Sequence, residues 1–111
     1  MRTLKMWEIW FANFPFDDSD VKKKRPVIVL NIEPAEVLSI KVTSHNARND
    51  DKYDVAIEKW EEAGLDRPSV ARISKSMILI KDEFIHKIGT LHTNDQTNIM
   101  MKYIQFINDN T

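Results

Sequence analysis

The side chains best suited to chemistry form a short cationic run, Lys22-Lys23-Lys24-Arg25, which ends at Pro26. An arginine fork matches the geometry of a phosphate, whereas each lysine is a mobile point charge. Proline fixes its own φ and holds the residue before it in an extended conformation. We therefore expect Arg25 to make a fixed anion contact at the start of a buried strand, while the three lysines lie on a loop and attract a polyanion. The alternative is a solvated loop that protects a strand edge.

A second polar group, Thr43-Ser44-His45, ends a segment of alternating polarity. Hydroxyl groups beside an imidazole could contact a phosphate that Arg25 holds, provided that the two strand ends are neighbours. The alternative is ordinary turn chemistry, which these residue types favour. His45 taken alone is more typical of a surface turn than of a catalytic base.

Arg72 is a further candidate cation. It alternates with Val70 on a short predicted strand that follows Arg67-Pro68. Alternation turns the side chain of Arg72 toward a groove or toward the interior. The alternative is an ion pair with the acidic segment 58–62, which would give Arg72 a structural role.

Metal chemistry is not expected from this sequence. The spacing of Asp17, Asp18 and Asp20 matches no calcium loop, because the glycine and the terminal glutamate of such a loop are missing. His86 and His92 lack companion ligands for zinc. The chain has no cysteine, which excludes thiolate chemistry and zinc–cysteine sites. We expect neither a metal nor another cofactor.

Short strands must position these groups. Aromatic, β-branched and alternating residues predict strands over residues 6–13, 26–32, 36–44, 53–57, 69–74, 77–80 and 87–91, with a kink at residues 75–76. The last element differs, because Thr93-Asn94-Asp95-Gln96 has the form of a capping box and helical apolar spacing follows over residues 94–108. The pattern predicts a mainly β chain, a small twisted barrel with a C-terminal α-helix packed against it. The first strand is apolar on both faces, which suggests a subunit interface.

The composition limits the classes of function. The chain has 111 residues, enough for one domain over 1–111. Sixteen basic and seventeen acidic side chains give a net charge of −1, so nucleic-acid binding by bulk charge is excluded and any polyanion site is local. Two glycines exclude a glycine-rich phosphate loop. The sequence has no apolar stretch of membrane-spanning length and no signal peptide, so we expect a cytoplasmic protein that does not bind membranes.

Four ordered blocks resemble the MazF/PemK family of toxin endoribonucleases, at residues 8–18, 24–30, 40–44 and 68–72. With the terminal helix, the resemblance covers nearly the whole chain. It implies an SH3-like barrel of the MazF/PemK/CcdB type, a homodimer, and metal-independent cleavage of single-stranded RNA at short sequences. It also implies an antitoxin partner whose tail occupies the RNA groove, with DNA bound only through the antitoxin complex.

The resemblance also implies roles for individual residues. Arg25 matches the arginine of the family's Arg-Pro motif, Thr43 matches the threonine at the end of the third strand, and Arg72 falls where some members carry a catalytic arginine. Those members have an aspartate two residues later, and this chain has Ser74 instead. The usual Gly-Asp opening of the first strand is Met6-Trp7-Glu8 here.

The implied reaction needs a base for the 2′-hydroxyl, stabilisation of the phosphorane and help for the leaving 5′-oxygen. Arg25 would stabilise the phosphorane, Thr43 would position it, and Arg72 would add charge or protonate the leaving group. An arginine cannot serve as the base. The sequence leaves the base open among three candidates: His45, Glu8 and Asp17.

RNA binding would use the remaining polar groups. These are Lys22, Lys23, Lys24, Ser44 and His45, with Phe16 as an aromatic surface on which a base can stack. The alternative function is a catalytically degenerate barrel that binds a protein partner or nucleic acid without cleavage, as the structurally similar gyrase-poisoning toxins do. The serine at position 74 favours that alternative.

Overall fold

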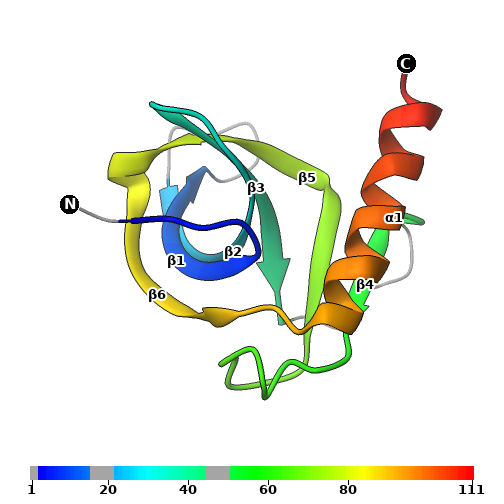
Figure 1. The fold of residues 1–111 in the computed structure, drawn as a ribbon, viewed down its shortest axis with the longest axis horizontal. Helices are drawn as coiled ribbons and strands as arrows, with labels where there is room; N and C mark the ends of the chain where they lie inside the picture. Colours follow the sequence, from blue (N-terminus) through cyan, green and yellow to red (C-terminus); the bar gives the residue numbers. More distant parts are fainter. Residues whose placement is uncertain (1–2, 16–21, 45–50) are drawn as a thin grey trace.

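The computed structural model describes residues 3–15, 22–44 and 51–111. A strongly curved sheet occupies most of this part of the chain, and one long helix lies along it (Figure 1). The elements are β1 (Glu8–Pro15), β2 (Lys22–Ile32), β3 (Glu36–Thr43), β4 (Asp54–Ile57), β5 (Ser69–Ile80), the 3₁₀ turn η1 (Lys81–Glu83), β6 (Phe84–Thr90) and α1 (Thr93–Asp109). A mainly β fold with a C-terminal helix is therefore confirmed.

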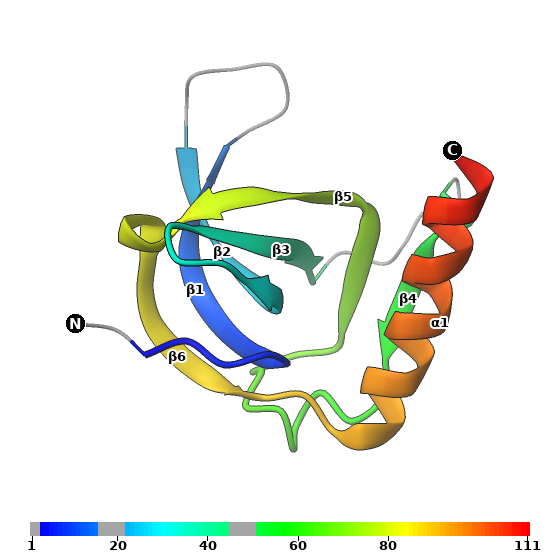
Figure 2. The same ribbon diagram turned by 45° about the horizontal axis from the view of Figure 1, so that its top comes forward.

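The six strands form one antiparallel sheet in the order β4-β5-β3-β2-β1-β6. The sheet curls around itself, as Figure 2 shows, but within the described residues no pairing joins β4 to β6, so the barrel stays open. The sharp bend of β5 lies where two separate strands with a kink were predicted. Ser39 of β3 pairs with Met77, whereas Lys41 pairs with Arg72. The extra residues of β5 bulge there, and the strand turns the corner without a break.

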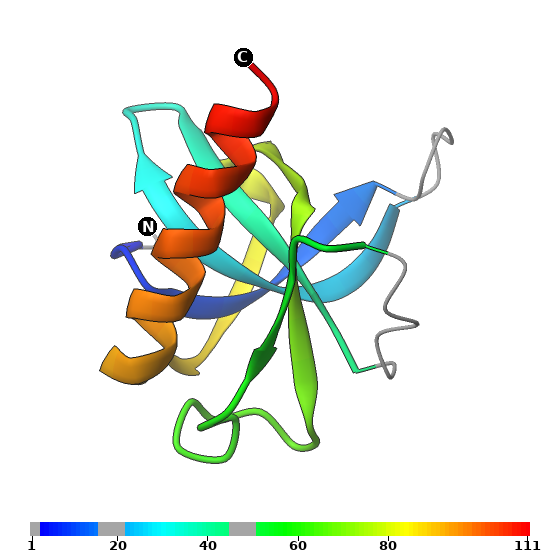
Figure 3. The ribbon, with the colours of Figure 1, turned by 90° about the vertical axis from the view of Figure 1, so that its right-hand side faces the viewer.

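Both faces of the sheet are buried within one chain. The cluster beneath α1 includes Ile9, Ile28 and Ile40, and the cluster on the opposite face includes Trp10 and Phe84. Figure 3 shows α1 crossing the first of these faces. The curvature of the sheet covers the second face. The apolar faces of the first strand therefore need no subunit interface to cover them, because the monomer itself buries both.

The helix begins one residue earlier than its capping sequence predicts. His92 is the N-cap, and its Nδ1 accepts a hydrogen bond from the backbone N–H of Asn94 at 3.1 Å. Asp95 in the first turn is completely buried, and its two carboxylate oxygens accept the backbone N–H groups of Glu58 and Lys59, each at 2.9 Å. These bonds tie the start of α1 to the end of β4.

The far end of α1 is tied to the segment before β4. The hydroxyl of Tyr53 donates to Asp109 Oδ2 at 2.8 Å, and the ring of Tyr53 meets that of Phe106 edge-on, with centroids 4.9 Å apart. The backbone that leads into β4 is therefore held against the helix at both ends. In the described ranges, no helix is long and apolar enough to cross a membrane.

Candidate active site

Arg25 lies inside β2, because this strand begins at Lys22 and not at Pro26. Its backbone is opposite Ala12 of β1, and Lys23 is opposite Phe14. Arg25 is half-buried. The expectation of a free lysine loop before a strand mouth is wrong, since the pairing with β1 extends through the cationic run. The ladder with β1, in addition to the proline, fixes the backbone of Arg25.

Thr43 ends β3 beside Arg25. Val27 of β2 pairs with Lys41 of β3 at this end of the ladder. Arg25 is two residues before Val27 and Thr43 is two residues after Lys41, so alternation turns their side chains to the face of Val27 and Lys41. Arg25, Thr43 and Lys41 therefore project from one face of the sheet.

Arg72 of β5 belongs to this face, because it pairs with Lys41 on one side and with Asp54 of β4 on the other. Its Nε is 3.3 Å from Asp54 Oδ1, and its Nη2 is 4.0 Å from Asp51 Oδ2. Arg72 thus has ion-pair partners, but these precede or belong to β4. The alternative, an ion pair with the acidic segment 58–62, is not seen among the described residues, where the partners are Asp51 and Asp54.

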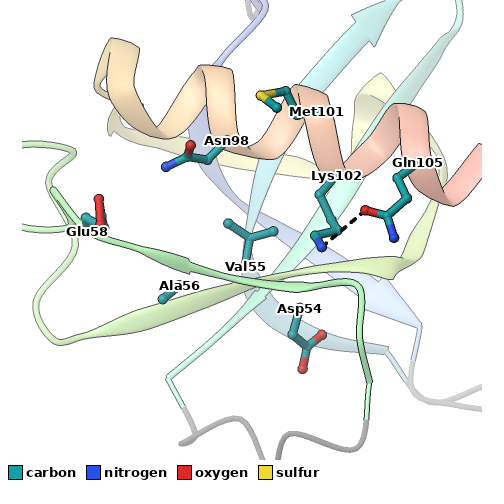
Figure 4. A pocket seen from close by; sticks show the side chains of 8 residues that line it. All are labelled: Asp54, Val55, Ala56, Glu58, Asn98, Met101, Lys102 and Gln105. Atoms are coloured by element: carbon teal, nitrogen blue, oxygen red, sulfur yellow. Dashed lines mark hydrogen bonds between the residues drawn. The ribbon is translucent and has the colours of Figure 1, made fainter.

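The face is the one turned away from α1. Figure 4 shows the carboxylate of Asp54 pointing away from the helix while the neighbouring Val55 points toward it. The Nζ atom of Lys41 lies 5.9 Å from the centre of the Phe14 ring. Phe14 belongs to the buried cluster on the side opposite the helix. The polar residues therefore border the end of that second core.

The helix side carries a separate hollow. A groove of about 450 Å³ runs between β4 and α1 (Figure 4). Its lining consists of Asp54, Val55, Ala56, Glu58, Asn98, Met101, Lys102 and Gln105. It contains none of the predicted site residues, and we do not assign the chemistry to it.

Charge on the site face is predominantly positive. Four cationic side chains that the strand registers place on this face, near the ends of β2 and β3, are Lys23, Arg25, Lys41 and Arg72. Two carboxylates, Asp51 and Asp54, pair with one of them. Lys24 projects from the other face by alternation. Such a face can hold a polyanion along the strand ends while the two arginines approach it from separate strands.

Sequence reasoning missed three residues of this face. Lys41 alternates with Thr43, so the strand pattern could have identified it. Asp51 and Asp54 carried no signal, because only the pairing of β4 with β5 brings them to Arg72. Their location could not be read from the local sequence.

Other predicted residues contribute less or lie elsewhere. Ser44 is exposed and follows β3 directly. Phe16, His45 and Asp17, as well as the side chain of Lys22, lie outside the described residues. Glu8 lies at the other end of β1, where its carboxylate accepts bonds from Trp10 Nε1 at 3.0 Å and from Lys5 N at 2.9 Å, and pairs with Lys87 Nζ at 3.0 Å. These contacts make Glu8 a structural group and remove it from the candidates for the base.

Comparison with known proteins identifies the family to which the chain belongs. A family profile described as "PemK-like, MazF-like toxin of type II toxin-antitoxin system" matches residues 5–107. An endoribonuclease solved in complex with its cognate antitoxin, from a mycobacterial species, superimposes with a TM-score of 0.75 at 12% identity, with 96% of each chain covered. The Mycobacterium tuberculosis toxin MazF-mt6 superimposes with a TM-score of 0.66 at 20% identity, covering 86% of this chain and 91% of that one. No curated protein sequence matches significantly. The structural likeness concerns the fold, and the profile match shows that the chain belongs to the PemK-like, MazF-like toxins of type II toxin–antitoxin systems.

Proposed function

We propose that this toxin is an endoribonuclease that cleaves single-stranded RNA at short sequences, without a metal, by attack of the 2′-hydroxyl on the adjacent phosphorus. The observation that carries the proposal is the common face of Arg25, Thr43 and Arg72, which three different strands supply. Family membership supports the same activity. The products would be a 2′,3′-cyclic phosphate and a free 5′-hydroxyl.

Each of the three side chains has its own role in the cleavage reaction. Arg25 is held in a paired strand and offers its fork of donors to the phosphorane oxygens, where negative charge increases during attack. Thr43 hydrogen-bonds the phosphate and fixes its position relative to Arg25. Arg72 brings a second positive charge to the leaving 5′-oxygen, and its carboxylate partners orient it there.

The RNA backbone follows the cationic face. Lys23 and Lys41 attract phosphates on either side of the reacting one, and Ser44, His45 and Lys22 contact flanking nucleotides, while Lys24 on the other face adds diffuse positive charge. Phe16 offers a ring on which a base stacks. We propose a cognate antitoxin as the natural inhibitor, in the cytoplasm, whose chain covers this face; DNA is bound only through that complex. The antitoxin complex of one structural relative supports this partner.

We also propose a homodimer. The helix exposes large apolar side chains at helical spacing, with Met101, Ile104 and Ile107 of α1 65%, 51% and 40% exposed. Isolated exposed apolar residues are normal, but several on one side favour an interface. A second copy of the chain would cover them.

The test is cleavage of a mixed-sequence RNA by the purified toxin in the presence of a metal chelator. We expect the wild type to cut, and Arg25→Ala to lose at least 100-fold in rate, the usual cost on the order of 10² or more when a donor to a developing oxyanion is removed. Arg67→Ala is the matched control, because Arg67 is an exposed arginine paired with Asp66 and its loss changes the charge equally.

Two results would refute the proposal. RNA that stays intact at high concentrations of the wild-type toxin would refute the endoribonuclease activity and favour the non-cleaving binder. Equal cleavage by the wild type and Arg25→Ala would show that the reaction takes place elsewhere.

A further inference from the structure

The cleavage reaction proposed above needs a base, and this inference rests on that reaction. Arg25, Thr43 and Arg72 cannot remove a proton from a 2′-hydroxyl near neutral pH, because two are permanently charged donors and the third is an alcohol. Glu8 is held at the other end of β1. Within the described residues, the carboxylates in contact with the site arginines are Asp51 and Asp54.

The two carboxylates differ in exposure and in contacts. The side chain of Asp54 is 9% exposed, and its Oδ1 accepts a hydrogen bond from Arg72 Nε at 3.3 Å. The side chain of Asp51 is 21% exposed, and its Oδ2 lies 4.0 Å from Arg72 Nη2. Asp54 can therefore hold the guanidinium of Arg72 in place from the buried side. Asp51 contacts the same guanidinium from the side that is more open to solvent.

Asp51 is also held in one orientation. Its Oδ1 accepts the backbone N–H of Tyr53 at 2.9 Å, and its Oδ2 accepts the hydroxyl of Ser74. Tyr53 is itself tied to Asp109 at the end of α1. A carboxylate has about four acceptor sites, so these contacts leave capacity for a substrate hydroxyl.

The contacts of Asp51 set its charge state. Burial raises the pKa of Asp51, but the bonds from Ser74 and Tyr53 N and the positive charges of Arg72 and Lys75 outweigh burial and lower the pKa below its ordinary range. Among the described residues, further charged groups near it are Asp54 of β4 and, next along the chain, the Lys52–Asp109 pair at the end of α1. Asp51 is therefore ionised at neutral pH and ready to accept a proton.

Ser74 stands where the family resemblance predicts an aspartate. Its hydroxyl donates to Asp51, so a carboxylate from the segment before β4 occupies the space next to position 74. The two residues are 23 positions apart in the sequence, and the pairing of β4 with β5 brings them together. The serine therefore does not deprive the site of a carboxylate.

We propose that Asp51 is the general base of the toxin, and that Asp54 is the positioning residue that orients Arg72. The carboxylate of Asp51 takes the proton of the 2′-hydroxyl, and the freed 2′-oxygen forms a bond to the adjacent phosphorus. The bond from phosphorus to the 5′-oxygen breaks, and that oxygen takes a proton from water beside Arg72. Asp51 then returns its proton to the solvent, so that atoms and charge balance.

The test compares Asp51→Asn, Asp51→Glu and the control Asp66→Asn, since Asp66 is an exposed carboxylate whose only described ion pair is with Arg67. Single-turnover cleavage of one RNA is measured from about pH 2.5 to pH 9, and binding is measured with the same RNA carrying 2′-O-methyl groups. We expect Asp51→Asn to lose about 10²–10⁴-fold in rate, with affinity changed less than threefold. We expect Asp51→Glu to recover at least tenfold of that loss, and Asp66→Asn to match the wild type.

The pH profile separates a base from a merely structural residue. Because the pKa of Asp51 lies below its ordinary value of 3.8, the wild-type rate should be level above about pH 4 and fall at more acid pH, and this acid limb should vanish in Asp51→Asn. An acid limb that persists in Asp51→Asn, or an unchanged rate, overturns the role of Asp51 while the cleavage activity stands. Loss of RNA binding in a folded Asp51→Asn overturns it as well. A wild type that leaves RNA uncut overturns the proposed function and this assignment together.

Discussion

At the scale of single residues, Trp7 is the most unusual position. Its φ is +74°, and among the described residues only Gly64 shares a positive value. The conformation lets the N–H of Trp7 bond Val29 O at 2.7 Å while its carbonyl accepts Leu91 N at 2.9 Å, which ties the start of β1 to β2 and to the end of β6. The family resemblance predicts glycine at this position. A bulky residue in this region costs about 1–2 kcal/mol of conformational energy.

Because the backbone at Trp7 is strained, we expect glycine to be more stable than alanine at this position, the reverse of the usual order within a strand. Trp7→Ala loses the half-buried indole and keeps the strain, whereas Trp7→Gly loses the indole and removes the strain. We expect the glycine variant to exceed the alanine variant by about 1 kcal/mol in free energy of unfolding, measured by urea denaturation. At Phe11, within β1, alanine should be the more stable variant. An alanine variant at position 7 as stable as the glycine variant would argue against backbone strain.

Glu8 should make the stability of the toxin depend on pH. Burial raises the pKa of Glu8, but hydrogen bonds from Trp10, Lys87 and Lys5 N outweigh it and lower the pKa below its ordinary value of 4.5. A depressed pKa adds stability above the unfolded-state pKa, and this contribution disappears as the pH falls through the folded-state pKa. Wild type should therefore exceed Glu8→Gln by about 1.5–3 kcal/mol at pH 7, the worth of bonds to a charged group.

Urea denaturation of both proteins between pH 3 and pH 7 checks this prediction. The difference should be constant above about pH 5 and should shrink toward pH 3. Glu33→Gln, an exposed substitution of the same kind, controls for the change in net charge. A difference that grows toward acid pH would contradict the sign of the shift.

At the scale of elements, β2 separates the lysines by face. Lys23 shares the face of Arg25, whereas Lys24 projects to the opposite face. We expect Lys23→Ala to weaken binding of 2′-O-methyl RNA and to reduce the slope of log affinity against log salt by about 0.7, the value for one phosphate contact on a single strand. Lys24→Ala should change the slope by a clearly smaller amount. Equal effects would mean that the run acts only as diffuse charge.

The elements also show what the sequence can predict. Alternation and helical spacing located the six strands and α1, because periods of 2 and 3.6 are local properties. The start of β2 was missed, since lysines resemble a loop until pairing with β1 is considered. The bend of β5 was read as a break, because a bulge depends on the register with β3. The contact of Asp51 with Arg72 and Ser74 was invisible for the same reason.

At the scale of the whole molecule, the curved sheet separates two surfaces. The cationic face lies away from α1, and α1 itself exposes the apolar side chains of Met101, Ile104 and Ile107. A toxin that dimerises through the helix side would keep both cationic faces open to RNA. In this arrangement the cationic face binds RNA and the helix side forms the dimer.

Solution mass tests the dimer. We expect sedimentation equilibrium to give the mass of two chains for the wild type and to shift toward one chain for Ile104→Asp, because a charge in an apolar interface is costly. Gln105→Asp, an exposed neighbour on α1, places the same charge beside it and should stay dimeric. A monomeric wild type, or a dimer unaffected by Ile104→Asp, would place the interface elsewhere or remove it.

The central claim is that the toxin cuts RNA by means of the RNA's own 2′-hydroxyl. The most direct measurement uses two oligonucleotides that contain one mapped cleavage site, identical except for a 2′-deoxy sugar on the 5′ side of the scissile phosphate. In chelator, we predict that the all-ribose strand is cut to a 2′,3′-cyclic phosphate and a 5′-hydroxyl, while the deoxy strand binds and stays intact. Cleavage of the deoxy strand at the same bond would contradict the account.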